Sequence, residues 1–316
     1  MKIALIGPGI MPVPPVGWGA CEILIYNLAE AVRALGHTVD IYNNPNIEEV
    51  SNQINSIDYD FIHASYDNHA EPLLKFLKKK FCITSHYGFI NRQEAWDPHY
   101  HYLNQQVLKC PGIIALSPEI SSLYDRFGYN GFKRVLRNGA DVKKFRFSEK
   151  GNGKAICLGK IEPRKSNNYL ASRCNGIEID YWGPLAEPFR GNETNIHRGE
   201  LSKEQLYDQL TEYSTLVLLS AGEAAPLVLP EAMAAGLSIV ISPWCTANLP
   251  LDKKWITVID TQDKLNNLPA YINGAIGTNQ NYRQEIRSFA ERYFDWSIIV
   301  GDYIKTLEEW KEYNKQ

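Results

Sequence analysis

The fold is decided by the stretch Thr215–Ser242, which reads TLVLLSAGEAAPLVLPEAMAAGLSIVIS. It begins with an apolar run typical of a buried strand, Thr215–Leu219, and ends with a second one, Ile239–Ser242. Between them, Pro230 suits the first turn of a helix, where no backbone donor is needed, and Gly236 suits the end of that helix. The stretch therefore predicts a strand, a helix and a second strand in succession.

The same alternation of strands and helices continues along the rest of the chain. Further strands are expected at Lys2–Ile6, Thr38–Tyr42, Phe61–Ala64, Phe81–Thr84, Gly112–Leu116, Lys154–Leu158 and Ile177–Trp182. Helical spacing of apolar residues covers Cys21–Leu35, Lys203–Tyr213 and Tyr282–Glu312. This alternation is typical of parallel sheets with helices on both faces, so we expect an α/β protein.

The chain has 316 residues, which is long enough for two domains that each bury a core. The polar, glycine-containing stretch Phe145–Gly153 is a reasonable boundary between them. We therefore expect an N-terminal domain over residues 1–148 and a C-terminal domain over residues 149–290.

The composition excludes several classes of protein. A net charge of −3 provides no overall basic field, so nucleic acid is not expected as a partner. The 6 cysteines are scattered without a Cys-x-x-Cys pair, which fits reduced cytosolic thiols better than a disulfide framework or a zinc site. The N-terminal apolar run is too short for a secretory signal, and no run approaches ~20 apolar residues. We expect a cytoplasmic protein with at most peripheral membrane contact.

Two carboxylates lie in the deciding stretch. Glu223 comes just past the carboxyl end of a strand, where ligands bind in open α/β sheets, and Glu231 falls in the first helical turn. Together they can accept hydrogen bonds from the several hydroxyl groups of a sugar or a ribose. The alternative is that Glu231 only complements the helix dipole and that Glu223 is solvated.

The pattern Glu-x7-Glu followed by Ala-Met-Ala-Ala-Gly resembles the signature of the retaining glycosyltransferases with the GT-B fold, of the glycosyltransferase family 4 type (glycosyl transferases group 1). This resemblance implies two Rossmann-like domains facing each other across a cleft. It also implies that Glu223 contacts the hydroxyls of the donor sugar and that Glu231 holds the ribose of the nucleotide. The donor-binding loop is then expected to include Ala224, Ala225, Leu227 and Val228. The family often has Gly where this chain has Pro226, which lacks a backbone N–H.

A cationic run, Gly159-Lys-Ile-Glu-Pro-Arg-Lys165, directly follows the strand that opens the second domain. Breaking a sugar–phosphate bond loads charge onto the departing pyrophosphate, and fixed cations stabilise that charge in the transition state. The run resembles the family's Gly-Arg…Lys motif, with Lys165 at the Lys position and Lys160 where Arg is usual. Arg164 is expected to compensate for the looser grip of Lys160. Taken alone, such a run is also compatible with a solvated turn.

Four residues of the first half are candidates for the same site. Gly17 and Gly19 precede a helix, whose first backbone N–H groups are free to bind an anion. In the family this loop faces the donor phosphates or the acceptor. His86 follows a strand, where the family has a His near the donor sugar and the reacting carbon. Asn138 belongs to an Asn-Gly-x-Asp segment that resembles the family's, although Asn-Gly also makes a tight turn without any function.

The resemblance extends to the end of the chain. The segment Tyr293–Trp296 resembles the aromatic segment after which the last helices of the family cross back onto the first domain. Residues 291–316 are therefore expected to pack against the N-terminal domain. The resemblance makes the N-terminal domain the acceptor side and the C-terminal domain the donor side.

Three further patterns in the sequence have both a structural and a functional interpretation. Asp58-Tyr-Asp60 looks like an Asp-x-Asp metal site, but it directly precedes a strand, so we expect a strand-initiating polar pair and no catalytic metal. The run Lys75–Lys80 could contact acidic lipid, although a solvated helix end is favoured. An aromatic run at residues 96–102 has two equally plausible interpretations, a platform for a sugar acceptor and ordinary packing.

The resemblance implies an enzyme that moves a sugar from a nucleotide-diphosphate sugar to an acceptor hydroxyl with retention of configuration. The nucleotide sugar is a co-substrate, and no further cofactor is expected. The acceptor would be a glycan, a lipid-linked molecule or a small molecule, and the base, the sugar and the oligomeric state are left open. The alternatives are an epimerase or phosphorylase of the same fold, or a non-catalytic protein that binds nucleotide sugars or glycans. A nicotinamide oxidoreductase is disfavoured because Gly-x-Gly-x-x-Gly is absent after the first strand.

Overall fold

The computed structural model describes residues 1–14 and 19–315, and the chain divides into two compact units. Unit 1 comprises Met1–Gly139 and Trp296–Gln316, and unit 2 comprises Ala140–Asp295. Unit 2 thus begins earlier than residue 149, the boundary expected from composition. The reason is that Val142 and Phe145 are buried in the core of unit 2, which draws the polar stretch around them into that unit.

Unit 1 is built on a six-stranded sheet in the order β2-β1-β3-β4-β5-β6, and all neighbouring strands are parallel. Its strands are β1 (Lys2–Ile6), β2 (Thr38–Tyr42), β3 (Phe61–Ala64), β4 (Cys82–Ile83), β5 (Gly112–Ala115) and β6 (Phe132–Val135). Its helices are α1 (Ala20–Ala34), α2 (Ile47–Asn55), α3 (Ala70–Phe76), α4 (Pro98–Val107), α5 (Pro118–Arg126) and α12 (Trp296–Tyr313). The strand order reverses at β1, so the loops after β1 and β3 flank a topological switch point.

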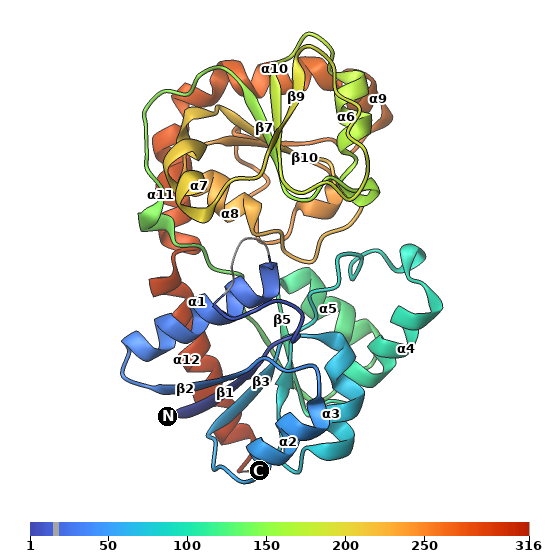
Figure 1. The fold of residues 1–316 in the computed structure, drawn as a ribbon, viewed down its shortest axis with the longest axis vertical. Helices are drawn as coiled ribbons and strands as arrows, with labels where there is room; N and C mark the ends of the chain where they lie inside the picture. The colour runs from blue at the N-terminus through green and yellow to red at the C-terminus, as the bar shows by residue number, and fades with distance from the viewer. Residues whose placement is uncertain (15–18, 316) are drawn as a thin grey trace. The chain divides into compact units, whose positions relative to one another are not determined.

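The last helix, α12, completes the core of unit 1 although it comes after the whole of unit 2 (Figure 1). Tyr303 and Trp310 of this helix are buried. The ring of Trp310 packs edge-on against the rings of Phe61 and Phe132, with centroid distances of 5.8 Å and 5.0 Å. The expected return of the C-terminal helix to the first domain is confirmed. The crossing lies at Trp296, and residues 291–295 stay with unit 2.

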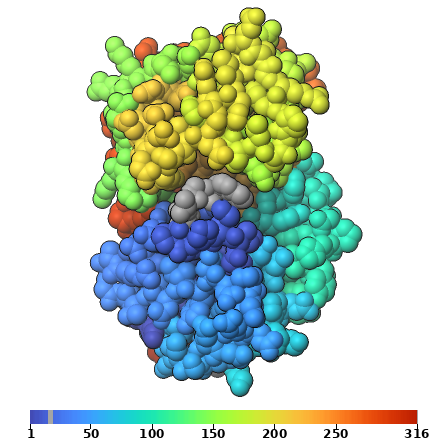
Figure 2. Space-filling model, in the orientation of Figure 1, coloured from blue at the N-terminus to red at the C-terminus, as the bar shows by residue number. Residues whose placement is uncertain are grey.

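Unit 2 repeats the design with a sheet in the order β12-β11-β10-β7-β8-β9, again all parallel. Its strands are β7 (Ala155–Leu158), β8 (Ile179–Trp182), β9 (Asn195–Gly199), β10 (Thr215–Leu218), β11 (Ser238–Ile241) and β12 (Ile256–Val258). Its helices are α6 (Asn167–Arg173), α7 (Lys203–Gln209), α8 (Val228–Ala234), α9 (Gln262–Asn266), α10 (Leu268–Thr278) and α11 (Arg283–Tyr293). The strand order reverses between β7 and β10, which makes this the topological switch point of unit 2. Helix α7 lies at the surface of the unit (Figure 2).

The deciding stretch folds as β10, α8 and β11, as expected. Successive side chains of a strand point to opposite faces of its sheet. In β10, Leu216 and Leu218 enter one buried cluster while Val217 enters the other, so both faces of the sheet are covered. Coverage on both faces explains why the strand is apolar throughout rather than alternating. Gly236 ends the helix with φ +84°, a conformation that favours glycine.

A buried arginine, Arg283 at the start of α11, joins segments that are distant in the sequence. It is 1% exposed, and burial lowers the pKa of its guanidinium to about 10. Its six hydrogen bonds go to the carbonyl oxygens of Ser148, Thr211, Tyr213 and Ala235, the hydroxyl of Thr211 and the side-chain oxygen of Asn279. These oxygens replace water around the charge, so Arg283 fixes α11 against the loops next to β7 and β10.

We expect Arg283→Met to lower the free energy of unfolding of unit 2 by about 3 kcal/mol or more, because several buried carbonyls lose their donor. Urea unfolding followed by circular dichroism measures the change. Arg292→Met on the same helix is the matched control, since Arg292 bonds only an exposed carbonyl, and its effect should stay within about 0.5 kcal/mol. Equal effects of the two variants would contradict the role given to Arg283.

Candidate functional site

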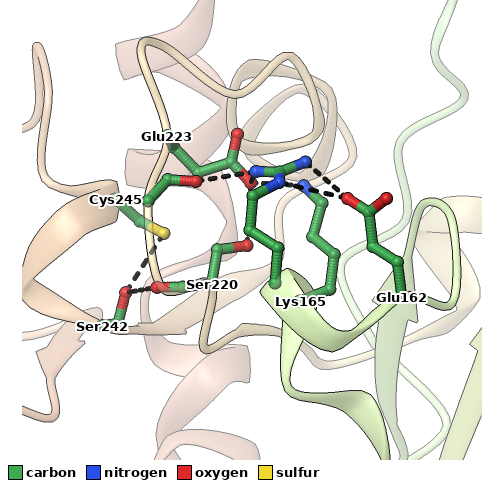
Figure 3. A network of polar contacts seen from close by, with 8 residues as sticks. Glu162, Lys165, Ser220, Glu223, Ser242 and Cys245 are labelled. Carbon is green, nitrogen blue, oxygen red and sulfur yellow. Dashed lines mark hydrogen bonds and ion pairs between the residues drawn. The ribbon is translucent and has the colours of Figure 1, made fainter. Parts of the chain in front are cut away.

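Charged side chains converge at the switch point of unit 2, in the loops that follow β7 and β10 (Figure 3). Lys165 forms an ion pair with Oε1 of Glu223. Arg164 Nη1 lies 2.9 Å from the same oxygen, and the Ser220 hydroxyl donates to it at 2.8 Å. The carboxyl ends of adjacent parallel strands meet at one edge of a sheet, which is why residues so far apart in sequence come together here.

The β7 loop is shaped by turns that aim its cations at the β10 loop. Gly159 leaves the strand with φ +120°, and a short 3-10 turn follows at Pro163–Lys165. Ser166 then adopts the left-handed conformation, φ 56°, which is costly for a residue other than glycine and is often found at functional sites. The two loops are joined directly by the hydrogen bond from Ala221 N to Arg164 O at 2.7 Å.

Arg164 is committed to the protein itself. It makes four hydrogen bonds: two to Glu162 Oε1, at 2.7 and 3.1 Å, one to Gly222 O at 2.7 Å and one to Glu223 Oε1 at 2.9 Å. A guanidinium has five N–H donors, so one remains for a ligand. Arg164 was expected to bind the donor, whereas its contacts point to a role in holding Glu223. The ammonium group of Lys165, by contrast, bonds only Glu223 within the described chain and keeps donors free.

Glu223 stays charged although its side chain is only 10% exposed. Burial raises the pKa of its carboxyl, but Lys165 and Arg164 outweigh this effect and hold the pKa below its ordinary value. The second oxygen, Oε2, makes no hydrogen bond to any described residue. This oxygen is therefore an acceptor that a ligand can use.

The loop after Glu223 carries free backbone donors. Within the described chain, the N–H groups of Glu223, Ala224, Leu227 and Val228 make no hydrogen bond, and Pro226 has no N–H to offer. Ala225 lies in the same loop. Free amides beside a lysine suit an anionic ligand such as a phosphate.

Glu231 lies in the first turn of α8 and pairs with Lys203 of α7. Sequence reasoning singled out Glu231 but missed Lys203. The only local signal at Lys203 is the preceding Ser202, which caps α7 and belongs to a capping box. No spacing rule links the two partners, because their contact depends on how α7 and α8 pack in the folded unit.

The other candidates are placed as follows. Lys160 follows Gly159 in the β7 loop and is exposed. Gly19 is the N-cap residue that precedes α1, with φ +138°, and a Cβ there would lie 3.2 Å from Glu22 Oε2. Gly17 lies outside the described residues. Lys160 thus belongs with the unit 2 cluster by its loop, while Gly19 belongs to unit 1.

His86 and Asn138 line a cavity of about 40 Å³ in unit 1, together with His63, Ser65 and Thr84. Burial lowers the pKa of His86 to about 4, so its imidazole is neutral at pH 7 and can donate one hydrogen bond and accept another. His63 Nε2 lies 2.8 Å from the Thr84 hydroxyl, whereas His86 makes no hydrogen bond to a described residue. His86 is therefore the histidine of the pair that can serve a ligand.

The patterns weighed against function have structural explanations. Asp60 accepts a hydrogen bond from Lys2 N at 2.6 Å and pairs with Lys311 at 2.6 Å, as expected for a polar residue that begins a strand. In the aromatic run, Trp96 and Tyr100 are buried against each other, which is packing, while Tyr102 is 46% exposed. Among residues 1–14 and 19–315, no group of three or more histidine, cysteine, aspartate or glutamate side chains could hold a metal ion.

All six cysteines are free thiols. Over the described residues, none of the helices combines the length and the apolar character needed to cross a bilayer.

Comparisons with known proteins identify the fold. No family model and no curated protein sequence matches the chain. Among solved structures, a sucrose-phosphate synthase from Thermosynechococcus elongatus matches with a TM-score of 0.78 at 17% identity, covering 98% of both chains. AviGT4, a glycosyltransferase involved in avilamycin A biosynthesis, matches with a TM-score of 0.70 at 16% identity, and the match covers 98% of both chains. HepE of Anabaena, solved with UDP and glucose, matches with a TM-score of 0.73 at 14% identity, and the match covers 98% of this chain and 100% of HepE. The chain has the GT-B fold, which confirms the fold predicted from the sequence.

We expect the contact of Lys165 with Glu223 to be a strong one, with a coupling free energy of about 1–3 kcal/mol, because both side chains are largely buried. Urea unfolding of the wild type, Lys165→Met, Glu223→Gln and the double variant measures it. The exposed pair Lys264 and Asp260, at 2.8 Å, is the control, and its coupling should stay below about 0.5 kcal/mol. Similar couplings for the two pairs would show that the contact at the switch point is only a surface ion pair.

Proposed function

We propose that this protein is a glycosyltransferase that moves a sugar from a nucleotide-diphosphate sugar to an acceptor hydroxyl with retention of configuration. The observation that carries this proposal is the convergence of Lys165 and Glu223 at the switch point of unit 2. A cation with free donors lies there beside a carboxylate with a free acceptor oxygen. A nucleotide sugar has the complementary parts, an anionic pyrophosphate next to a sugar rich in hydroxyls.

In the proposed complex, Lys165, Lys160 and the free amides of the loop after Glu223 bind the pyrophosphate. When the bond between the anomeric carbon and phosphate oxygen breaks, both electrons leave with the phosphate, and its charge grows. A fixed ammonium group stabilises that growing charge more than it stabilises the bound donor, so it lowers the barrier. Arg164 contributes indirectly, by holding Glu223 and the loop in place.

The two carboxylates bind the two sugars of the donor. Oε2 of Glu223 accepts from hydroxyls of the transferred sugar, and Glu231 accepts from the ribose. The acceptor is a glycan, a lipid-linked molecule or a small molecule, and we assign its binding to unit 1, where the neutral imidazole of His86 can donate one hydrogen bond and accept another. The acceptor oxygen attacks from the face that the phosphate leaves, and its proton passes to the departing phosphate oxygen.

The structural neighbours suggest the first donors to test. HepE has been solved with UDP and with UDP-glucose. UDP-glucose and related UDP-sugars are therefore the first choice, followed by GDP- and ADP-sugars. Product analysis separates the proposal from its alternatives: a phosphorylase requires free phosphate, an epimerase requires no acceptor, and a binding protein makes no product.

We expect Lys165→Ala to reduce sugar transfer by about 10²–10³-fold in kcat, as found when a single donor to developing negative charge is removed. Donor turnover is measured by release of the nucleoside diphosphate. Lys253→Ala serves as the control, because Lys253 pairs with Glu285 on an exposed surface, and it should leave turnover unchanged. Near-normal transfer by Lys165→Ala would refute the role proposed for this lysine.

We also propose that transfer needs no metal ion, since the charge of the leaving group is met by lysines and backbone amides. Turnover should be the same after treatment with EDTA as before it, within experimental error. Loss of activity in EDTA that returns with Mg²⁺ or Mn²⁺ would overturn this part of the proposal, and Lys165→Ala would then be re-examined under saturating metal.

A further inference from the structure

The pair formed by Glu231 and Lys203 is another contact in unit 2 between a lysine and a largely buried carboxylate, separate from the network around Glu223. Lys203 Nζ binds Oε1 of Glu231, and the two side chains are 32% and 11% exposed. Oε2 of Glu231 makes no hydrogen bond to a described residue. The contact therefore occupies one oxygen of a largely buried carboxylate and leaves the other available.

Lys203 is itself held in place by aromatic rings. Its Nζ lies 5.4 Å from the ring centroid of Tyr207 and 6.0 Å from that of Phe145, distances at which a cation is attracted to a ring face. The two rings meet edge to face at 4.8 Å, and the Tyr207 hydroxyl donates to Asp141 at 2.9 Å. A connected series of contacts thus runs from Asp141 through Tyr207 and Lys203 to Glu231.

This series has two physical consequences for Glu231. A buried carboxylate without a partner is strongly unfavourable, so the charge of Lys203 keeps Glu231 stable in its site. The contact on Oε1 also restricts rotation of the carboxylate, because turning it away would break the ion pair. Glu231 therefore presents its remaining lone pairs in a fixed direction.

We propose that Lys203 is a positioning residue for the nucleotide, and that it makes the site select ribonucleotides over 2′-deoxyribonucleotides. The proposal rests on the proposed function, in which Glu231 binds the ribose. A carboxylate fixed by Lys203 accepts hydrogen bonds from both the 2′ and the 3′ hydroxyl. A site built to bond a hydroxyl rejects the analogue that lacks it, because its buried acceptor is left unpaired. A carboxylate free to turn toward water would lose that selectivity.

The test compares binding of UDP and 2′-deoxy-UDP to the full chain by isothermal titration calorimetry. We expect the wild type to bind UDP about tenfold more tightly than 2′-deoxy-UDP, the value of one hydrogen bond to a charged group. Lys203→Met keeps the aliphatic stem and removes the charge. It should weaken UDP binding about tenfold and 2′-deoxy-UDP binding much less, so that the ratio of the two dissociation constants falls toward one. Lys203→Arg should preserve most of the selectivity.

Further variants and measurements make the result specific. Lys154→Met, which removes a lysine paired with Glu178 on the surface of the same unit, should leave both affinities unchanged. Adding Lys203→Met to Glu231→Gln should cause little further loss of UDP binding, because the lysine acts through Glu231. In turnover, Lys203→Met should raise KM for the donor with kcat nearly unchanged. Thermal unfolding of each variant, and Lys203→Gln as a second charge removal, exclude a misfolded protein as the cause.

The outcomes separate this inference from the proposed function. If the wild type binds none of UDP, GDP and ADP, the proposed function fails, and the role of Lys203 fails with it. If UDP does not bind but GDP or ADP does, the same comparison is made between that nucleotide and its 2′-deoxy analogue. If a ribonucleotide binds and Lys203→Met leaves the ratio unchanged, or weakens both nucleotides equally, the inference alone is overturned.

Discussion

The ion pairs on Oε1 of Glu223 join two loops that leave adjacent strands at the switch point of unit 2. Without Lys165 and Arg164, a carboxylate with this little exposure would be an uncompensated buried charge, and the two loops would lose their main link. Glu231 and Lys203 repeat the arrangement on the neighbouring helices. In both cases a cation holds one oxygen of the carboxylate, and the second oxygen has no partner in the described chain. Stability and ligand binding are thus assigned to different atoms of the same side chain.

Much of the fold could be predicted because central strands of parallel sheets are apolar on both faces and are bounded by strong turn residues. The stretch of β10, α8 and β11 is the clearest case, with Pro230 and Gly236 marking the helix. The edge strand β6, Phe132–Val135, was not predicted, because only one of its four residues is buried and two of them are charged. The domain boundary was placed too late for a related reason: composition does not show that Val142 and Phe145 are buried.

The candidate site could be predicted in part. Lys165 and Glu223 each follow a predicted strand within a short segment that resembles a family motif, so the sequence predicts both as site residues although it does not show their contact. Pairings that depend on the packing of helices left no such pattern, so Lys203 was missed. The division of labour between Arg164 and Lys165 was also beyond the sequence. Adjacent cations look alike in a sequence, and only their partners show that one holds the protein and the other keeps donors free.

Unit 2 is one continuous segment inserted into unit 1, and its two ends are side by side: Ala140 N donates to Phe294 O at 2.8 Å, and Ala140 bridges Asp295. On the ribosome, unit 2 is therefore complete before α12 has been made. The face of unit 1 that receives Trp310 stays uncovered during that time. Unit 1, although its first part is translated before unit 2, therefore cannot finish folding until unit 2 and then α12 have been synthesised. A gene fragment for residues 140–295 encodes a whole core, whereas one that stops at residue 139 encodes a sheet without its last helix.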